Sequence, residues 1–202
     1  MKKYLLWAFG LLVLVPVFLS SCSTSSKAVK EDVGKDPQVL SGEGVTLKLR
    51  YLDVKALYTL YNNRNNPFLY YSSGTLTVFD LNVTSDKPVQ LNLKDMQLSS
   101  DKGTRTYVSK QTLASFWDTR LTTVKTSRSN GRSDYSNWSR GTVLDTIDKQ
   151  MYPDVVSVPA GSETSGHVAF EIIRGAKNGK LSIPVKDSEG KLVHEFTYEF
   201  SF

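Results

Sequence analysis

The sequence predicts a mainly β domain in which two antiparallel sheets pack into a sandwich that carries short helical inserts. Apolar and polar residues alternate in several short runs, as they do in strands with one buried face. Turn-forming residues separate the runs, for example at 85–88 (SDKP) and 159–161 (PAG), and short strands spaced in this way are typical of a sandwich. Two stretches in which apolar residues recur at helical spacing predict the inserts.

The first half of the domain begins with a predicted strand over 45–51, where apolar and polar residues alternate. Asp53 is positioned to cap a short helix, whose predicted apolar stripe is Val54, Leu57, Tyr58 and Tyr61. A second strand is predicted over 76–83. Thr77, Phe79, Leu81 and Val83 share one of its faces, whereas the other face is apolar only at the end that holds Leu76 and Val78.

The second half of the domain contains further strands and two longer helical stretches. Helices are predicted around 113–121 and 144–151, where apolar residues share one face. Pro184 predicts an edge position for its strand, because proline has no N–H to donate to a neighbour. The remaining strands are predicted over 89–98, 104–108, 156–158, 168–172, 181–185 and 192–202. The last of them places on one face Leu192, His194, Phe196, Tyr198, Phe200 and Phe202.

The N-terminal segment has the pattern of an export signal. Lys2 and Lys3 precede an uncharged stretch over 4–19, which is shorter than the ~20 apolar residues that span a membrane. The stretch ends in Leu19-Ser20-Ser21-Cys22, which resembles the lipobox of bacterial lipoproteins. The resemblance implies cleavage before Cys22 and acylation of that residue with diacylglycerol and usually a further acyl chain such as palmitate. Ser23 after the cysteine implies the outer membrane in an organism that has one.

These observations divide the chain into three parts. Residues 1–21 are the predicted signal peptide, 22–44 a lipidated N-terminus and flexible tether rich in Ser, Lys, Asp and Gly, and 45–202 the sandwich domain. Cleavage removes two lysines, so the net charge falls from +5 for the whole chain to +3, which is no footprint for nucleic acid. One cysteine and two histidines in 202 residues also make a disulfide framework or a metal centre unexpected, and no cofactor is predicted.

Two stretches carry a resemblance to a family. TLTVFDLNVTSDKPVQLNLKDMQLSSDKG at 75–103 and VSVPAGSETSGHVAFEI at 156–172 are similar to the immunoglobulin-like domains of the DUF4352 type, which recur in bacterial lipoproteins and secreted proteins. The resemblance covers about half of the domain and implies an immunoglobulin-like sandwich without catalytic residues. The helical inserts and the polar stretch at 125–141 depart from the family's pattern.

A search for catalytic residues gives little. The sequence lacks the Gly-x-Ser-x-Gly, HExxH and phosphate-loop motifs. His167 and His194 lie on predicted strands, where a structural role is the expected one. Asp145 and Asp148 share a helix face, but a solvated surface accounts for them better than paired acid–base chemistry.

Two features could bind a partner or ligand. The first is an aromatic cluster around an asparagine-rich loop, which includes Tyr58, Tyr61, Tyr70 and Tyr71. The second is a polar stretch that combines arginine with aromatic residues, a combination suited to phosphate or carboxylate groups and to interface anchoring: Arg128, Arg132, Tyr135, Trp138 and Arg140. Packing of the short helix and a solvated loop are the corresponding structural alternatives.

The favoured hypothesis is a non-catalytic envelope lipoprotein, held to a membrane through Cys22, whose sandwich domain binds an envelope protein or acts as an accessory subunit. The alternative is a binding module for glycan or anionic lipid headgroups, and a minor alternative is an enzyme of unrecognised type. Under the binding-module hypothesis, replacing Arg128, Arg132 and Trp138 by alanine weakens ligand binding without lowering the melting temperature.

Overall fold

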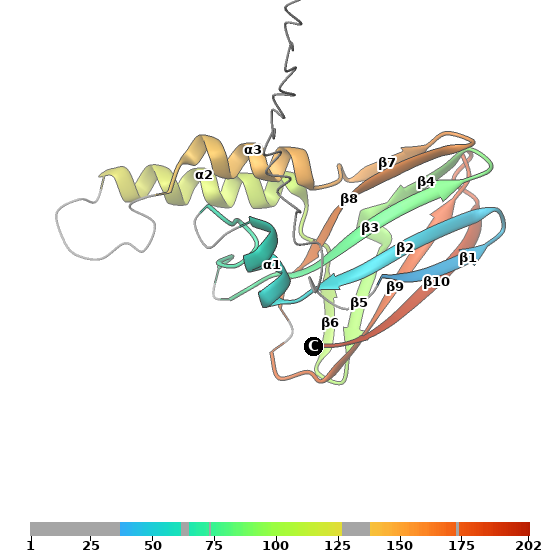
Figure 1. Ribbon diagram of the computed structural model, residues 1–202, viewed down its shortest axis with the longest axis horizontal. Helices are drawn as coiled ribbons and strands as arrows, with labels where there is room; N and C mark the ends of the chain where they lie inside the picture. Colours follow the sequence, from blue (N-terminus) through green and yellow to red (C-terminus); the bar gives the residue numbers. More distant parts are fainter. Residues whose placement is uncertain (1–36, 62–64, 73, 127–137, 173) are drawn as a thin grey trace, which may run out of the picture. The chain divides into compact units, whose positions relative to one another are not determined.

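The structure, a computed structural model, describes residues 37–61, 65–72, 74–126, 138–172 and 174–202. In these residues the predicted antiparallel β-sandwich with helical inserts is confirmed (Figure 1). The first sheet has four strands in the order β1-β2-β3-β8, and each pairing is antiparallel. The bounds of these strands are Gln38–Gly42 (β1), Val45–Leu52 (β2), Thr77–Ser85 (β3) and Ser162–Phe170 (β8).

The second sheet has six strands arranged around β9. One edge of β9 pairs along its length with β10, while the other edge pairs first with β5 and then with β4. The short 3-10 helix η1 (Leu93–Asp95) connects β4 to β5 between these two pairings. The strands are Val89–Asn92 (β4), Gln97–Ser100 (β5), Gly103–Thr106 (β6), Val155–Val158 (β7), Asn178–Lys186 (β9) and Leu192–Ser201 (β10).

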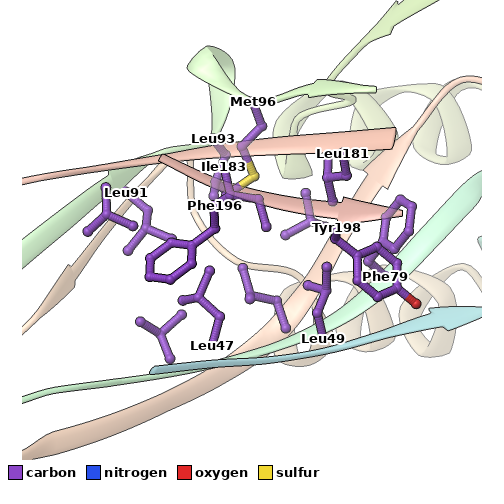
Figure 2. Packing of buried hydrophobic residues seen from close by; sticks show 14 of the residues in the cluster. Leu47, Leu49, Phe79, Leu91, Leu93, Met96, Leu181, Ile183, Phe196 and Tyr198 are labelled. Carbon is purple, nitrogen blue, oxygen red and sulfur yellow. The ribbon is translucent and has the colours of Figure 1, made fainter. Parts of the chain in front are cut away.

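The sandwich core lies between the two sheets, where alternate residues of the strands face one another (Figure 2). Leu47, Leu49 and Phe79 of the first sheet are buried against apolar side chains of β4, β9 and β10. Burying one such side chain stabilises the fold by about 1.5–3 kcal/mol. Gly179 takes part in this packing because a Cβ there would lie 2.4 Å from Cζ of Phe200, so the ring of Phe200 rests directly on the backbone of β9.

A second, helical core lies on the outer face of the first sheet. It belongs to the helical layer, which consists of α1 (Val54–Tyr61), α2 (Lys110–Thr126), α3 (Arg140–Gln150) and the described residues of 65–76. Val78, which neighbours Phe79, points into it, as do Leu52 and Ala169 from β2 and β8. One end of β3 is therefore covered on both faces, which explains why only that end of its outer face is apolar.

The two longer helices pack against each other in opposite directions. The ammonium nitrogen of Lys110, at the start of α2, lies 2.7 Å from Oδ1 of Asp148, near the end of α3. Arg140, at the start of α3, pairs with Asp118 in the middle of α2. Both of these helices were predicted from the sequence. Asp53 caps α1, also as predicted, because its Oδ1 accepts a hydrogen bond of 2.7 Å from the Ala56 amide.

Two expectations about the sheets are wrong. Residues 38–42 are not part of a tether but form β1, which pairs with β2 from Gln38 opposite Leu49 to Gly42 opposite Val45. Pro184 does not mark an edge strand, because β9 has neighbours on both sides. The proline is tolerated because it lies between the β5 and β4 pairings, where the neighbouring chain leaves the sheet as η1.

Two details of side-chain orientation also differ from the prediction. In α1 the buried residues are Ala56 and Leu57, whereas Val54 and Tyr58 are 47% and 38% exposed. Ala56 is buried in the helical core, and the predicted stripe is turned partly outward. In β10 a register shift after Leu192 leaves this residue exposed and packs Val193 against the sandwich core instead.

Candidate interaction surface on the helical layer

The structure joins the two binding features that the sequence presented separately. The ring of Tyr70 meets Trp138 edge-on, with centroids 5.9 Å apart, and Trp138 stacks on Trp117 at 4.9 Å with an interplanar angle of 21°. The hydroxyl groups of Tyr58 and Tyr70 lie 3.2 Å apart. The predicted aromatic cluster and the end of the predicted polar stretch therefore meet at the contact between α1, α2 and the start of α3.

Many of these aromatic side chains hold the helical layer together. Trp117 is fully buried, and its indole N–H donates a hydrogen bond of 3.0 Å to the Pro67 carbonyl. The ring of Tyr71 packs on Phe116 at 4.7 Å between centroids. Tyr58, Tyr70, Tyr71 and Trp138 remain partly open to solvent at the rim of this packing. The structural alternative thus accounts for most of the aromatic cluster.

Asparagine side chains fix the loop that carries these rings. Asn66 is fully buried, donates to the Leu57 carbonyl over 3.0 Å and accepts from the Phe68 amide over 3.1 Å. Asn65 accepts a hydrogen bond of 2.7 Å from the amide of Ser139, the N-cap residue of α3. The two contacts of Asn66 satisfy buried backbone groups, whereas the contact of Asn65 is exposed. The loop is therefore tied to α1 on one side and to α3 on the other.

Tyr61 belongs to a different arrangement, a polar chain beneath the helical layer. Arg50, Asp80 and His167 stand opposite one another on three adjacent strands. Nη2 of Arg50 donates to Oδ2 of Asp80 over 2.9 Å, and Nδ1 of His167 lies 3.5 Å from Oδ1, a distance of electrostatic contact. Nε2 of the same histidine contacts the Tyr61 hydroxyl, which donates over 3.4 Å to Gln150 of α3. The polar chain thus links the first sheet to α1 and α3.

The ionisation of this polar chain follows from its surroundings. Burial tends to raise the pKa of Asp80, but His167 and Arg50 lower it by more, so the pKa of this carboxyl group lies below its usual value. Burial, reinforced by the charge of Asp80, raises the pKa of Tyr61 well above its ordinary value. The phenol therefore stays protonated at neutral pH and remains a hydrogen-bond donor.

Other predicted site residues have no common site in the structure. Arg140 is exposed and is engaged with Asp118. His194 packs its ring on Phe196 at 4.4 Å between centroids and lies where a Cβ of Gly42 would be, so its role is structural. Arg128, Arg132, Tyr135 and the lipidation residue Cys22 lie outside the described residues, and their predicted roles stay predictions.

An apolar groove that sequence reasoning missed opens between α2, α3 and the start of β7. We call it the helix groove; its volume is about 490 Å³ and its lining is Lys110, Gln111, Ala114, Leu144, Ile147, Asp148, Pro153 and Asp154. Lys110 pairs with Asp148 across it, and Asp154 pairs with Lys94 at 2.7 Å. Helical spacing identified Leu144 and Ile147 as apolar, but it could not show that part of this face remains uncovered.

The carboxylates that could have formed an acid–base pair are engaged in ion pairs. Asp145 lies 2.8 Å from Lys149, and Asp148 is held by Lys110. Among the described residues, no group of three or more histidine, cysteine, aspartate or glutamate side chains could hold a metal ion. In the same part of the chain, no helix has the length and apolar character needed to cross a membrane.

Comparison with known proteins adds no relative: no protein-family model, no curated protein and no solved structure matches this chain. The resemblances to the lipobox and to DUF4352-type domains therefore rest on the sequence patterns alone.

Proposed function

We propose that this chain is a non-catalytic envelope lipoprotein, anchored through Cys22, whose sandwich domain binds a protein partner with its helical layer. The observation that supports the proposal is the helix groove, which lies on an insert beside the sandwich. Among the side chains that the structure describes, none from α1, α2 or α3 belongs to the sandwich core. The core between the two sheets therefore forms without side chains from these helices. This leaves the helices available to bind another molecule.

The chemistry of the groove suggests the kind of segment that would bind it. Ala114, Leu144 and Ile147 supply an apolar floor, and the rim carries the carboxylates of Asp148 and Asp154, which pair with Lys110 and Lys94. A partner helix with a short apolar stripe flanked by polar residues would complement both features. The volume of about 490 Å³ is enough for a few side chains, in keeping with a small anchoring contact.

Lipid anchorage is the second element of the proposal and is tested separately. Two or three acyl chains, at ~0.8 kcal/mol per buried CH2, would hold the domain on a bilayer. Replacing Cys22 by serine should abolish incorporation of labelled palmitate and move the protein out of the membrane fraction. A Cys22→Ser protein that stays in the membrane fraction and still carries label would contradict the anchor.

Site-directed photo-crosslinking in the native cells tests the groove. A photoreactive residue replaces Gln111, which is exposed at the groove, or Thr197, which is exposed on β10 and serves as the control position. We expect one discrete protein adduct at position 111 that is absent at position 197 and disappears when Leu144→Gln is added to a folded protein. Identical adducts at both positions, or none at position 111, would contradict the proposed partner surface.

The structure changes the test of the alternative function, binding of glycan or anionic lipid headgroups. Because Trp138 stacks on Trp117 and meets Tyr70, Trp138→Ala should lower the melting temperature. A ligand-binding test of the polar stretch should therefore use Arg128→Ala and Arg132→Ala alone.

A further inference from the structure

We infer that β10 binds an extended, basic segment of a protein partner, which adds to the second sheet as a further strand. Among the described strands, β10 pairs only with β9, so its other edge lies at the rim of the sheet (Figure 1). This surface is separate from the helix groove, and the inference does not rest on the proposed function.

The length and composition of β10 favour pairing with another strand. It has ten residues, and none of them is proline, lysine or arginine. Its register shift between Leu192 and His194 leaves the stretch from 194 to 201 in regular pairing with β9. Native sheets usually protect an edge with a short strand, with proline or with lysine, and β10 has none of these. A long, regular edge of this kind is the template that an added strand requires.

The hydrogen bonds of the backbone show which groups face the outer edge of β10. The Phe202 amide, directly after the strand, donates over 3.0 Å to the Lys177 carbonyl, which is toward β9. Hydrogen-bonded pairs alternate along an antiparallel ladder, so every second residue before Phe202 bonds to β9 in the same way. The residues between them direct their N–H and C=O groups outward. We call these the β10 edge: Glu195, Thr197 and Glu199.

The two faces of β10 differ, so an added strand would need one apolar and one polar face. Phe196 and Tyr198 point into the sandwich core (Figure 2), whereas the side chains of the β10 edge are exposed on the outer face. Beyond them Phe202 is 37% exposed, and its ring lies 5.9 Å from that of the half-buried Tyr51. Apolar side chains at every second position of an added strand would extend the packing of these inner rings.

The charge of Glu195 indicates what the outer face of the added strand should carry. On β9, Lys180 stands opposite Glu199 and offsets its charge, whereas Glu195 stands opposite Pro184. The Ser182 hydroxyl donates a hydrogen bond to the Glu195 carboxylate, but this neutral group leaves the charge in place. A lysine or arginine of the added strand beside Glu195 would form the opposite-charge pair that β9 does not provide.

A second copy of this chain fits the β10 edge less well. The other nearby lysine of β9, Lys186, is engaged with Asp95 at 2.7 Å. The pairing that would use the whole of β10 in two copies is centred on Thr197, and it would place Glu195 of one copy opposite Glu199 of the other. Like charges directly opposite each other destabilise a sheet. The structure therefore favours a different protein, with a basic and alternating segment, as the occupant.

Fluorescence anisotropy with a labelled peptide tests the β10 edge in the full mature chain. The probe is Lys-Val-Thr-Val-Lys-Val-Thr-Val-Lys with blocked ends, which as a strand presents valine on one face and lysine or threonine on the other. The controls are the same peptide with its internal amides N-methylated and a peptide with glutamate in place of each lysine. We expect the probe to bind at least tenfold more tightly than the N-methylated peptide, which cannot form the ladder, and more tightly than the glutamate peptide.

The first variant removes one outward N–H group. Thr197→Pro leaves the bonds from β10 to β9 intact, because the Thr197 amide does not face β9, and proline is accepted at such edge positions. It should weaken binding of the probe at least tenfold, whereas Thr197→Ala, which keeps the N–H group, should bind like the wild type. The comparison separates the backbone ladder from the side chain.

The second variant reverses a charge and decides the matter even if the proline variant fails to fold. Glu195→Lys should reverse the preference, so that the glutamate peptide binds more tightly than the lysine probe. Glu189→Lys changes the net charge by the same amount in the exposed turn before β10 and should leave the preference unchanged.

Four results would overturn the inference. They are no binding of the lysine probe, equal binding of the N-methylated peptide, an unchanged preference in folded Glu195→Lys, and a dimer of the protein alone that Thr197→Pro dissociates. The last would make a second copy the occupant, and the first would leave the glutamates as charges that keep the edge unpaired. All of these measurements use purified protein and peptide, so they do not depend on the adduct at position 111. In cells, a segment bound at β10 would give an adduct at position 197 distinct from the one expected at position 111.

Discussion

The sandwich core and the helical core meet on β3 but are built in different ways. The sandwich core draws its residues from alternate positions of strands in both sheets, so its members follow the local period of the sequence. The helical core collects residues from α1, the loop after it, two further helices and the outer face of three strands. Phe79 and Val78 are neighbours in the chain, yet each belongs to a different core.

This difference implies a one-way dependence between the two regions. The helical core uses Leu52, Val78 and Ala169, which are strand residues, as part of its apolar surface. The described part of the sandwich core, in contrast, contains no residue of the three helices. We therefore expect the sandwich to hold its structure when the helical layer opens, whereas the helical layer cannot persist when the sandwich unfolds.

The largest effect is expected when alanine substitutions in the two cores are compared. Phe79→Ala and Trp117→Ala each remove a fully buried aromatic side chain, at a cost of about 3–5 kcal/mol. Phe79→Ala should lower amide protection throughout the described domain. Trp117→Ala should lower it in α1, α2 and α3 while β4 and β9 keep most of theirs, and native-state hydrogen exchange by mass spectrometry resolves the two patterns.

A surface variant in the helical layer provides the control for that pair. Tyr58 is 38% exposed at the rim of the layer, so Tyr58→Phe, which removes only its hydroxyl contact with Tyr70, should change protection little. If Trp117→Ala lowered protection in β9 as much as in α2, the two cores would unfold as one unit and the one-way dependence would be wrong.

A smaller effect is expected at the polar chain that joins the two regions. Asp80→Asn weakens contacts with Arg50 and His167 and should cost about 1–2 kcal/mol at neutral pH, since the carboxylate is partly exposed. Because the folded pKa of Asp80 is lowered, its ionised form stabilises the protein above the ordinary aspartate pKa. That stabilisation is lost as the pH falls through the folded pKa.

Urea unfolding of the wild type and Asp80→Asn, at pH 7 and at pH 3, measures this contribution. We expect the difference in unfolding free energy between the two proteins to shrink at the lower pH. A difference that is the same at both pH values would show that the carboxylate's charge plays no part. Asp145→Asn, which removes an exposed ion pair with Lys149 on α3, is the matched control and should have little effect at either pH.

The contrast between the two cores also explains what the sequence could predict. Alternation at 45–51 and 192–202 identified β2 and β10, because a strand's two faces follow the local sequence. The stripe on α1 was predicted from its large apolar residues, but the neighbouring segments decide which face is covered, and they cover Ala56. The strand β1 was missed because its composition is that of a tether, and only pairing with β2 orders it.

The candidate surface was harder to predict than the fold. The sequence offered Tyr70 and Trp138 as candidate binding residues but could not show that they contact each other, since the described chain between them includes strands and a helix. The helix groove was missed for a related reason. It is lined by segments far apart in the chain, and Ala114 is not unusual in its local sequence.

The smallest expected effect tests whether the helical layer can be stabilised alone. Gly141 lies in the first turn of α3, is exposed, and has only Oγ of Ser139, at 4.0 Å, near the position of an added Cβ. Its φ is not positive, so Gly141→Ala should stabilise the helix by about 0.5 kcal/mol, mainly by reducing the freedom of the unfolded chain.

In hydrogen exchange, this gain should appear as higher protection in α3 and in α2, which packs on it, while β9 is unchanged. Gly161→Ala is the control, because that glycine has a φ of 68° in a turn of the sandwich, where alanine is strained and should destabilise. If Gly141→Ala raised protection equally in α3 and β9, the helical layer would open only with the sandwich. The insert would then be part of a single cooperative unit, and a partner bound in the helix groove would stabilise the whole domain.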